Sequence, residues 1–245
     1  MDCIVNFPLY IIIIIMKYLG IILVLVIVIL LLLSHSYFFQ KKRYVPFTRN
    51  GDYYIKEIPN FLSKEECQKI QEISQGKLSK SRVYTSDTDI QDDNVRISEQ
   101  CWLKDLDDPM LITISERIAK ITHTDVKSQE ELQVVKYKEG GFYKPHYDAC
   151  NKETDDCKRL NGGLGPRFIT FIMYLNDGFE GGETHFPNIH TSIKPEMGKA
   201  AIFYNVDDDG EILPKSLHGG MGVIGGEKWI ANKWIRLTAL AHKYD

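Results

Sequence analysis

The segment Tyr143-Lys144-Pro145-His146-Tyr147-Asp148 decides how the rest of the chain is interpreted. Pro145 favours an extended backbone, because it biases the preceding residue towards β conformation and cannot continue a helix. Side chains two residues apart in a strand point the same way. His146 and Asp148 therefore project into one space, and they predict two ligands of a metal site. The H-x-D pattern alone is weakly specific, so the interpretation depends on residues downstream.

The sequence around this segment is typical of a β-rich domain. Short apolar runs separated by glycine turns predict a sandwich or barrel; the runs cover residues 132–137, 168–175, 200–204 and 228–235. Upstream, Ser63 followed by Glu66 predicts a capped helix. An apolar stripe predicts a second helix from Asp108 or Pro109 to about Thr122. The polar stretches 77–98 and 149–166 predict long loops.

The metal site needs a second imidazole from a distant strand, for which the candidates are His185, His190, His218 and His242. His218 is preferred because it lies late in the β-rich region, directly before a glycine-rich turn. Two imidazoles and one carboxylate leave open positions and are typical of non-haem Fe(II) oxygenases.

Lys228 follows His218 by ten residues and opens a strand. Period-two alternation places Lys228, Ile230, Asn232 and Trp234 on one face. An inward-facing lysine requires a negative partner, and an anionic cosubstrate on the metal would supply one. The neighbouring Lys233 is expected to face solvent.

The combined pattern resembles the prolyl 4-hydroxylases, an iron- and 2-oxoglutarate-dependent family that includes short plant, algal and viral forms. The resemblance runs from about Tyr53 to Trp234. Its carriers are Phe61–Cys67, Tyr137, Tyr143–Asp148, Arg167, Gly181–Thr184, His218, Lys228-Trp229 and Lys233–Ile235. Here Met221-Gly222 replaces the Cys-Pro of many relatives, and no partner-binding domain precedes the catalytic region. The first departure excludes a disulfide sometimes found there, and the second favours a short form that needs no dedicated partner subunit.

The resemblance implies a mainly β fold with supporting helices (α+β), a double-stranded β-helix or jelly roll. It implies that His146, Asp148 and His218 bind Fe(II) and are catalytic together with Lys228. Lys228 would bind 2-oxoglutarate with help from Tyr137 and Thr184. Three further residues match positions at the peptide-substrate site: Tyr143, Arg167 and Trp234.

The implied activity is peptidyl-proline 4-hydroxylation, in which 2-oxoglutarate and O2 become succinate and CO2 and L-ascorbate rescues oxidised iron. The loops 77–98 and 149–166 would close over the peptide. Two alternatives stay open. One is a related oxygenase acting on another residue or a small molecule, and the other is a non-enzymatic jelly-roll binding module on a membrane stalk.

The N-terminus predicts a membrane anchor. Residues 18–33 are almost entirely Ile, Leu and Val, which is close to the length of about 20 residues that a spanning helix needs. We expect an anchor at 1–40, a juxtamembrane linker at 41–52, a helix and strand support region at 53–130, and the oxygenase core at 131–245. Lys41-Lys42-Arg43 favour a cytoplasmic domain, whereas the resemblance favours a lumenal domain in the secretory pathway, which we prefer.

Net charge and cysteine content say less about the function and the fold than the motifs do. The net charge of −3 gives no indication of nucleic-acid binding. Cys150 and Cys157 flank a short polar loop and could form a disulfide, and Cys67 and Cys101 could also pair.

Overall fold

The computed structural model describes residues 16–23, 26–29, 55–84, 89–151, 153–154, 157, 165–207 and 209–237. The chain divides into two units, Met1–Thr48 and Arg49–Asp245. In the first unit, residues 16–23 and 26–29 are helical. None of the helices within the described residues is both long and apolar enough to span a bilayer. Most of the anchor expected at 1–40 lies outside the described residues.

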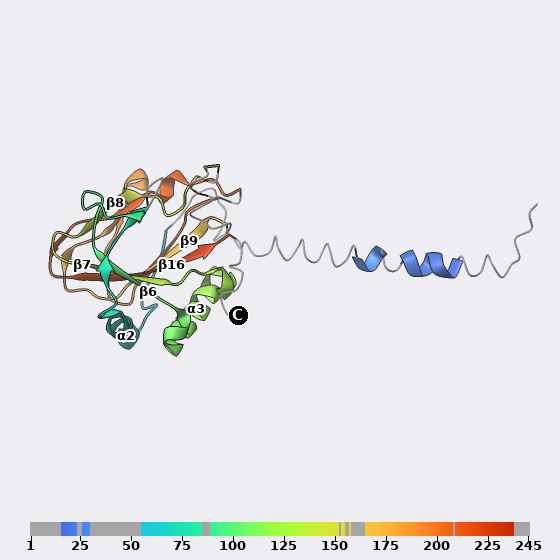
Figure 1. The fold of residues 1–245 in the computed structure, drawn as a ribbon, viewed down its shortest axis with the longest axis horizontal. Helices are drawn as coiled ribbons and strands as arrows, with labels where there is room; N and C mark the ends of the chain where they lie inside the picture. Colours follow the sequence, from blue (N-terminus) through green and yellow to red (C-terminus); the bar gives the residue numbers. More distant parts are fainter. Residues whose placement is uncertain are drawn as a thin grey trace, which may run out of the picture. The chain divides into compact units, whose positions relative to one another are not determined.

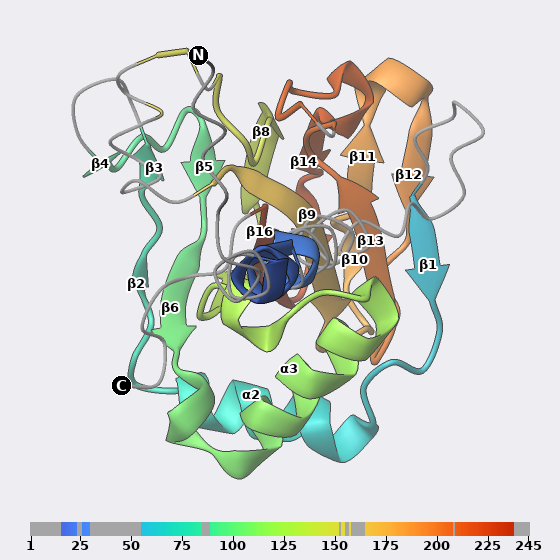
Figure 2. The same cartoon turned by 90° about the vertical axis from the view of Figure 1, so that its right-hand side faces the viewer.

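Two antiparallel sheets form the second unit (Figures 1 and 2). The larger sheet has seven strands in the order β1 (Lys56–Ile58), β13 (Ala200–Tyr204), β9 (Arg167–Tyr174), β16 (Lys228–Arg236), β7 (Leu132–Tyr137), β6 (Glu99–Leu103) and β2 (Ser79–Lys80). The smaller sheet has the order β12 (Thr191–Ile193), β11 (Thr184–Phe186), β14 (His218–Gly220), β8 (Phe142–His146) and β5 (Arg96–Ile97). The predicted mainly β architecture is confirmed.

Two small ribbons complete the β structure: β10 (Glu180–Gly181) pairs with β15 (Val223–Gly225), and β3 (Val83–Tyr84) pairs with β4 (Asp89–Ile90). The described residues also contain four short 3-10 helices in the connections: η1 (Asp105–Asp107), η2 (Val126–Ser128), η3 (Pro187–Ile189) and η4 (Pro214–Ser216).

An apolar core fills the space between the sheets. It is formed by Val135, Tyr137, Ile172, Tyr174, Phe186, Ile193, Ala201, Phe203, Val223 and Ile230. These residues come from β7, β9, β13 and β16 of the larger sheet and from β11, β12 and β15. Inward side chains of both sheets therefore form one core, as in other sandwich folds.

The predicted loop at 77–98 contains β2, β3, β4 and β5, so the expectation of an unstructured segment is wrong. Two-residue strands carry no periodic sequence signal. β2 and β5 form here because the longer strands β6 and β8 provide partners, whereas β3 and β4 pair with each other. Strands from residues 53–130 thus enter both sheets.

Both predicted helices are present, as α2 (Lys64–Ser74) and α3 (Pro109–Thr122). Ser63 caps α2 through the predicted capping box with Glu66. Asp108 caps α3, and Pro109 occupies its first turn. The helices lie on one side of the larger sheet and β8 lies on the other (Figure 1). They therefore cover the sheet face that points away from the smaller sheet.

Lys233 contradicts the expectation of a solvent-facing lysine. Its side chain is 1% exposed, and Nζ lies 2.6 Å from Oδ1 of Asp105 in η1. The outer face of β16 is covered by the helical layer, so the charge is buried and requires this partner.

Of the two disulfides that the sequence suggested, one is present among the described residues. Cys150 and Cys157 form a disulfide, as their spacing allowed. Cys67 and Cys101 are buried free thiols, so the suggested pair between them is wrong. Sγ of Cys67 in α2 donates to the Tyr174 carbonyl in β9 over 3.9 Å, whereas Cys101 lies in β6, three strands away in the larger sheet.

Candidate metal centre and active site

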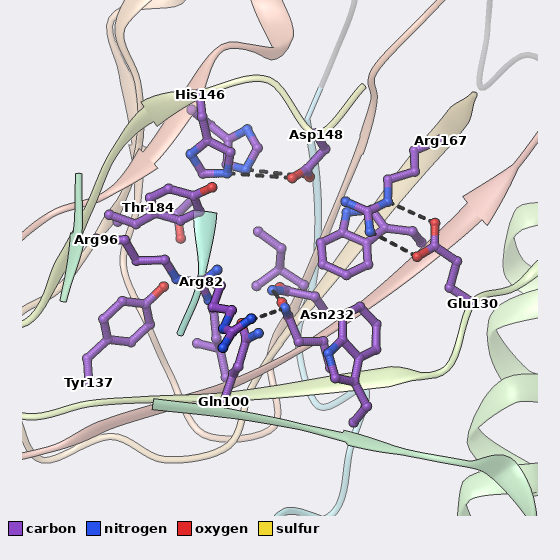
Figure 3. Close-up of a pocket in the computed structure, with 18 of the residues that line it drawn as sticks. Arg82, Arg96, Gln100, Glu130, Tyr137, His146, Asp148, Arg167, Thr184 and Asn232 are labelled. Atoms are coloured by element: carbon purple, nitrogen blue, oxygen red, sulfur yellow. Dashed lines mark hydrogen bonds and ion pairs between the residues drawn. The ribbon is translucent and has the colours of Figure 1, made fainter. Parts of the chain in front are cut away.

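The proposed metal ligands converge because two strands pair. His146 ends β8 and His218 begins β14, and the two residues are direct cross-strand partners. Asp148 follows His146 by two residues and turns towards both rings (Figure 3). The ligand atoms of His146, Asp148 and His218 all lie within 4.8 Å of one another. Residues 72 positions apart in sequence (146 to 218) thus form one three-residue cluster.

Hydrogen bonds set the tautomer of each imidazole. Nδ1 of His146 lies 2.9 Å from the carbonyl oxygen of Lys144, and Nδ1 of His218 lies 2.9 Å from that of Ser216. A carbonyl only accepts, so both Nδ1 atoms carry the proton. The Nε2 atoms are left with free lone pairs, 3.5 and 3.6 Å from the Asp148 carboxylate.

The charge state of the cluster suits a divalent metal. Burial lowers the pKa of His218 to about 4, so its ring is neutral at pH 7. Burial by itself would raise the pKa of Asp148, but the neighbouring His218, His146 and Arg167 outweigh it, hold that pKa well below its usual range and keep the carboxyl ionised. Two imidazoles and one carboxylate fit the donor set of non-haem Fe(II).

A cavity of about 560 Å³ opens beside the cluster, within the range of small-molecule sites. Lys228, Tyr137 and Thr184 line it. Lys228 is 1% exposed, and burial lowers its pKa to about 8. Within the described part of the chain its amine makes no hydrogen bond or ion pair, and it lies 5.1 Å from the centre of the Tyr137 ring. An anion entering the cavity would therefore find an ammonium that no hydrogen bond or ion pair within the described residues engages.

The other predicted site residues line the same cavity. Tyr143 stacks on His146 with ring centres 3.7 Å apart. The Arg167 guanidinium lies 3.6 Å from the centre of the Trp234 ring and forms a two-point ion pair with Glu130, at 2.8 and 2.9 Å. This edge of the cavity presents a planar cation and aromatic faces (Figure 3).

Known proteins that are similar to this chain agree with an oxygenase site of this kind. Residues 132–236 match the 2OG-Fe(II) oxygenase superfamily. A putative prolyl 4-hydroxylase of Acanthamoeba polyphaga mimivirus is 36% identical over 180 residues, which cover 73% of this chain and 72% of the viral protein. The chain belongs to the prolyl 4-hydroxylase family. It is an Fe(II)- and 2-oxoglutarate-dependent dioxygenase.

Two further members of the prolyl 4-hydroxylase family define how far the likeness extends. One is the viral collagen prolyl hydroxylase from Paramecium Bursaria Chlorella virus-1, whose crystal structure is a complex with 2OG. Its sequence is 31% identical to that of this chain. The two structures superpose with a TM-score of 0.59, and the match covers 76% of this chain and 97% of the viral chain. Human prolyl 4-hydroxylase subunit alpha-3 is 38% identical over 184 residues, but these cover only 33% of that subunit.

Arg96 and Glu130 are among the cavity residues of this dioxygenase that sequence reasoning missed. Arg96 in β5 lies 4.6 Å from the centre of the Tyr143 ring. Glu130 holds Arg167 and also contacts Arg236 at 3.0 Å. Arg96 fell within the predicted loop at 77–98, and Glu130 belongs to no local motif. Only the pairing of distant strands brings either residue to the cavity.

The remaining histidine candidates lie elsewhere or outside the described residues. Nδ1 of His185 contacts the Ser192 hydroxyl at 2.8 Å, and His190 ends η3 in a left-handed conformation. His242 lies outside the described residues. The prediction that Trp234 shares a face with Lys228 agrees with the cavity lining.

Proposed function

We propose that the protein hydroxylates C4 of proline residues in peptides, with 2-oxoglutarate and O2 as cosubstrates. One oxygen atom enters the proline C–H bond, and the other enters succinate as 2-oxoglutarate loses CO2. The observation that carries the proposal is the convergence of His146, Asp148, His218 and Lys228 on one cavity. The likeness to a viral collagen prolyl hydroxylase along nearly its whole length supports it.

Each group of residues has a distinct task in this proposal. His146, Asp148 and His218 would hold Fe(II), which supplies the oxidising chemistry that couples decarboxylation to hydroxylation. Lys228 binds the distal carboxylate of 2-oxoglutarate. Tyr137 and Thr184 border the same space, where the Tyr174 hydroxyl donates to Thr184 over 2.8 Å and orients it.

The peptide would lie at the outer edge of the cavity, against Tyr143, Arg167 and Trp234. Trp234 Nε1 is buried and has no hydrogen-bond partner within the described residues. A buried N–H without a partner is costly, and a peptide carbonyl would satisfy it. This favours a substrate with a backbone rather than a small molecule that lacks amide groups.

The cellular setting is also a proposal. An apolar anchor within residues 1–40 would tether the domain, and L-ascorbate would keep the iron reduced. The Cys150–Cys157 disulfide supports a lumenal domain, because disulfides persist in oxidising compartments. Protection of the domain from protease in sealed microsomes, lost on adding detergent, tests this orientation.

The activity test uses the full chain in mild detergent with Fe(II), ascorbate, 2-oxoglutarate and a panel of collagen-like and hydroxyproline-rich-type peptides. Succinate formation and mass spectrometry of each peptide are measured together. We expect one added oxygen at C4 of proline and none on matched peptides with alanine in place of proline. Succinate release coupled to oxidation of another residue would instead identify a related oxygenase. Absence of coupled succinate with every peptide, from protein that binds metal, would refute the proposal.

A further inference from the structure

Two buried side chains outside the ligand set connect to Asp148 through hydrogen bonds. The Thr170 hydroxyl donates to Oδ2 of Asp148 over 2.6 Å, and Nδ2 of Asn205 donates to Oγ1 of Thr170 over 2.7 Å. The directions are fixed, because the carboxylate only accepts and the hydroxyl has one proton to give. Thr170 is 1% exposed and Asn205 is 0% exposed. Bulk water therefore does not compete for these bonds.

The backbone of Asn205 connects to a second ligand. Its carbonyl accepts from the Leu213 N–H over 2.9 Å, and the Leu213 carbonyl accepts from the Ser216 N–H and hydroxyl, over 2.8 and 2.7 Å. The Ser216 carbonyl in turn accepts from Nδ1 of His218. Asn205 thus belongs to one chain of hydrogen bonds that runs from Asp148 to His218.

We propose that Thr170 and Asn205 are positioning residues for the metal centre. Thr170 fixes the rotation of the Asp148 carboxyl group about its Cβ–Cγ bond, and Asn205 fixes the Thr170 hydroxyl. Through Leu213 and Ser216, the same asparagine stabilises the turn that orients His218. Hydrogen-bonding partners of metal ligands commonly contribute 10- to 100-fold to metal affinity. The proposal rests on the assignment of His146, Asp148 and His218 as ligands.

Packing alone does not account for an asparagine at position 205. Oδ1 of Asn205 is buried and has no hydrogen-bond partner within the described residues. Burying a polar atom without a partner costs free energy, and an apolar side chain would avoid that cost. The bond that the amide provides is the one to Thr170.

The test measures Mn(II) binding by the full chain in detergent, from the electron paramagnetic resonance signal of free Mn(II). Thr170→Val keeps the shape of the side chain and removes the hydroxyl, so we expect the Kd for Mn(II) to rise about 10- to 100-fold. Thr170→Ser keeps the hydroxyl and should stay within about threefold of wild type. Asn205→Ala should weaken binding, but the double variant should bind no more weakly than Thr170→Val, because Asn205 acts through Thr170.

Thr122→Val is the matched control. It removes a buried hydroxyl that donates to the Ile118 carbonyl over 2.8 Å in α3, away from the cavity. It should lower the melting temperature of the metal-free protein and leave the Kd for Mn(II) unchanged. The comparison separates loss of stability from loss of metal-site geometry.

The proposal is overturned if Thr170→Val binds Mn(II) as tightly as Thr122→Val does, or if the effects of Thr170→Val and Asn205→Ala on Kd add. If Thr170→Val does not fold, Asn205→Ala decides alone, and an unchanged Kd refutes the proposal. Failure of the ligand assignment looks different. In that case wild type and His218→Ala would bind Mn(II) equally weakly, before Thr170 is considered.

Discussion

Replacing Lys228 by methionine tests the cosubstrate site directly. Methionine has a similar length and no charge, so the cavity keeps its shape and loses the ammonium. Truncating one partner of a buried charge pair costs about 2–5 kcal/mol, and 1.4 kcal/mol is tenfold in Kd. We therefore expect the Kd for 2-oxoglutarate to rise at least about 30-fold. The affinity for Mn(II) should stay unchanged, because Lys228 is not among the clustered ligand residues.

The pKa of Lys228 adds a pH signature. Burial lowers that pKa to about 8, so Lys228 loses its positive charge as the pH rises through 8. Only the protonated amine attracts a carboxylate. At pH 9 roughly a tenth of the molecules carry the ammonium, so the wild-type affinity for 2-oxoglutarate should fall about tenfold between pH 7 and pH 9. Lys228→Met should show no such fall.

The lowered pKa also predicts how stability depends on pH. Below pH 8 both folded and unfolded chains carry the Lys228 proton, and the folded chain bears the full cost of burying the charge. Between pH 8 and the ordinary lysine pKa of 10.5 the unfolded chain binds more protons. Without cosubstrate, wild type should therefore gain stability relative to Lys228→Met by up to about 3 kcal/mol over that window.

Isothermal titration of Mn(II)-loaded protein with 2-oxoglutarate under anaerobic conditions measures the affinities, and urea denaturation measures the stabilities. Lys136→Met is the matched control, because its amine pairs with Glu227 at 2.8 Å on the outer face of the neighbouring strand β7. The reasoning is wrong if Lys228→Met and Lys136→Met bind 2-oxoglutarate equally well. It is also wrong if loss of Lys228 weakens Mn(II) and 2-oxoglutarate to the same extent.

Four further outcomes follow from packing and charge. Gly219→Ala places a methyl group 2.8 Å from the Tyr143 carbonyl oxygen, so calorimetry should show a loss of about 1–3 kcal/mol together with weaker Mn(II) binding. Lys233→Met removes the ammonium that pairs with the buried Asp105 carboxylate, so urea denaturation should show a loss of about 3–5 kcal/mol, with the Kd for 2-oxoglutarate unchanged. Ser63→Ala removes the cap of α2 and should cost about 1 kcal/mol by the same measurement. Arg167→Lys keeps the charge but loses the two-point pair with Glu130, so steady-state kinetics should show a higher KM for peptide and an unchanged KM for 2-oxoglutarate.

The sequence predicted the parts of the fold whose signals are local. The capping box at Ser63 and the apolar stripe after Asp108 depend on neighbours within one or two turns, and both helices formed where expected. Period-two alternation likewise predicted which side chains of β16 face the cavity. These features need no knowledge of distant residues.

Other features depend on contacts that no local pattern encodes. The strands β2 and β5 have two residues each, and their backbone groups pair only because β6 and β8 lie beside them. Lys233 alternates with Trp234 as a solvent-facing lysine would, yet a helical layer covers it and Asp105 neutralises it. Glu130 reaches Arg167 across 37 residues of sequence. Each of these outcomes was decided by which segments meet in space.

The metal centre shows why a weak motif became specific in this fold. H-x-D sets the direction of two side chains, but nothing in those residues fixes where the third ligand comes from. The register of β8 against β14 does so, because it makes His146 and His218 cross-strand partners. An irregularity follows within one step, where Gly220 pairs with Tyr143, and such bulges re-aim side chains near active sites. Gly219 permits the close approach, since any side chain there would meet the backbone of Tyr143 and Pro145. Gly219 is therefore part of the proposed metal site, although it contributes no ligand atom.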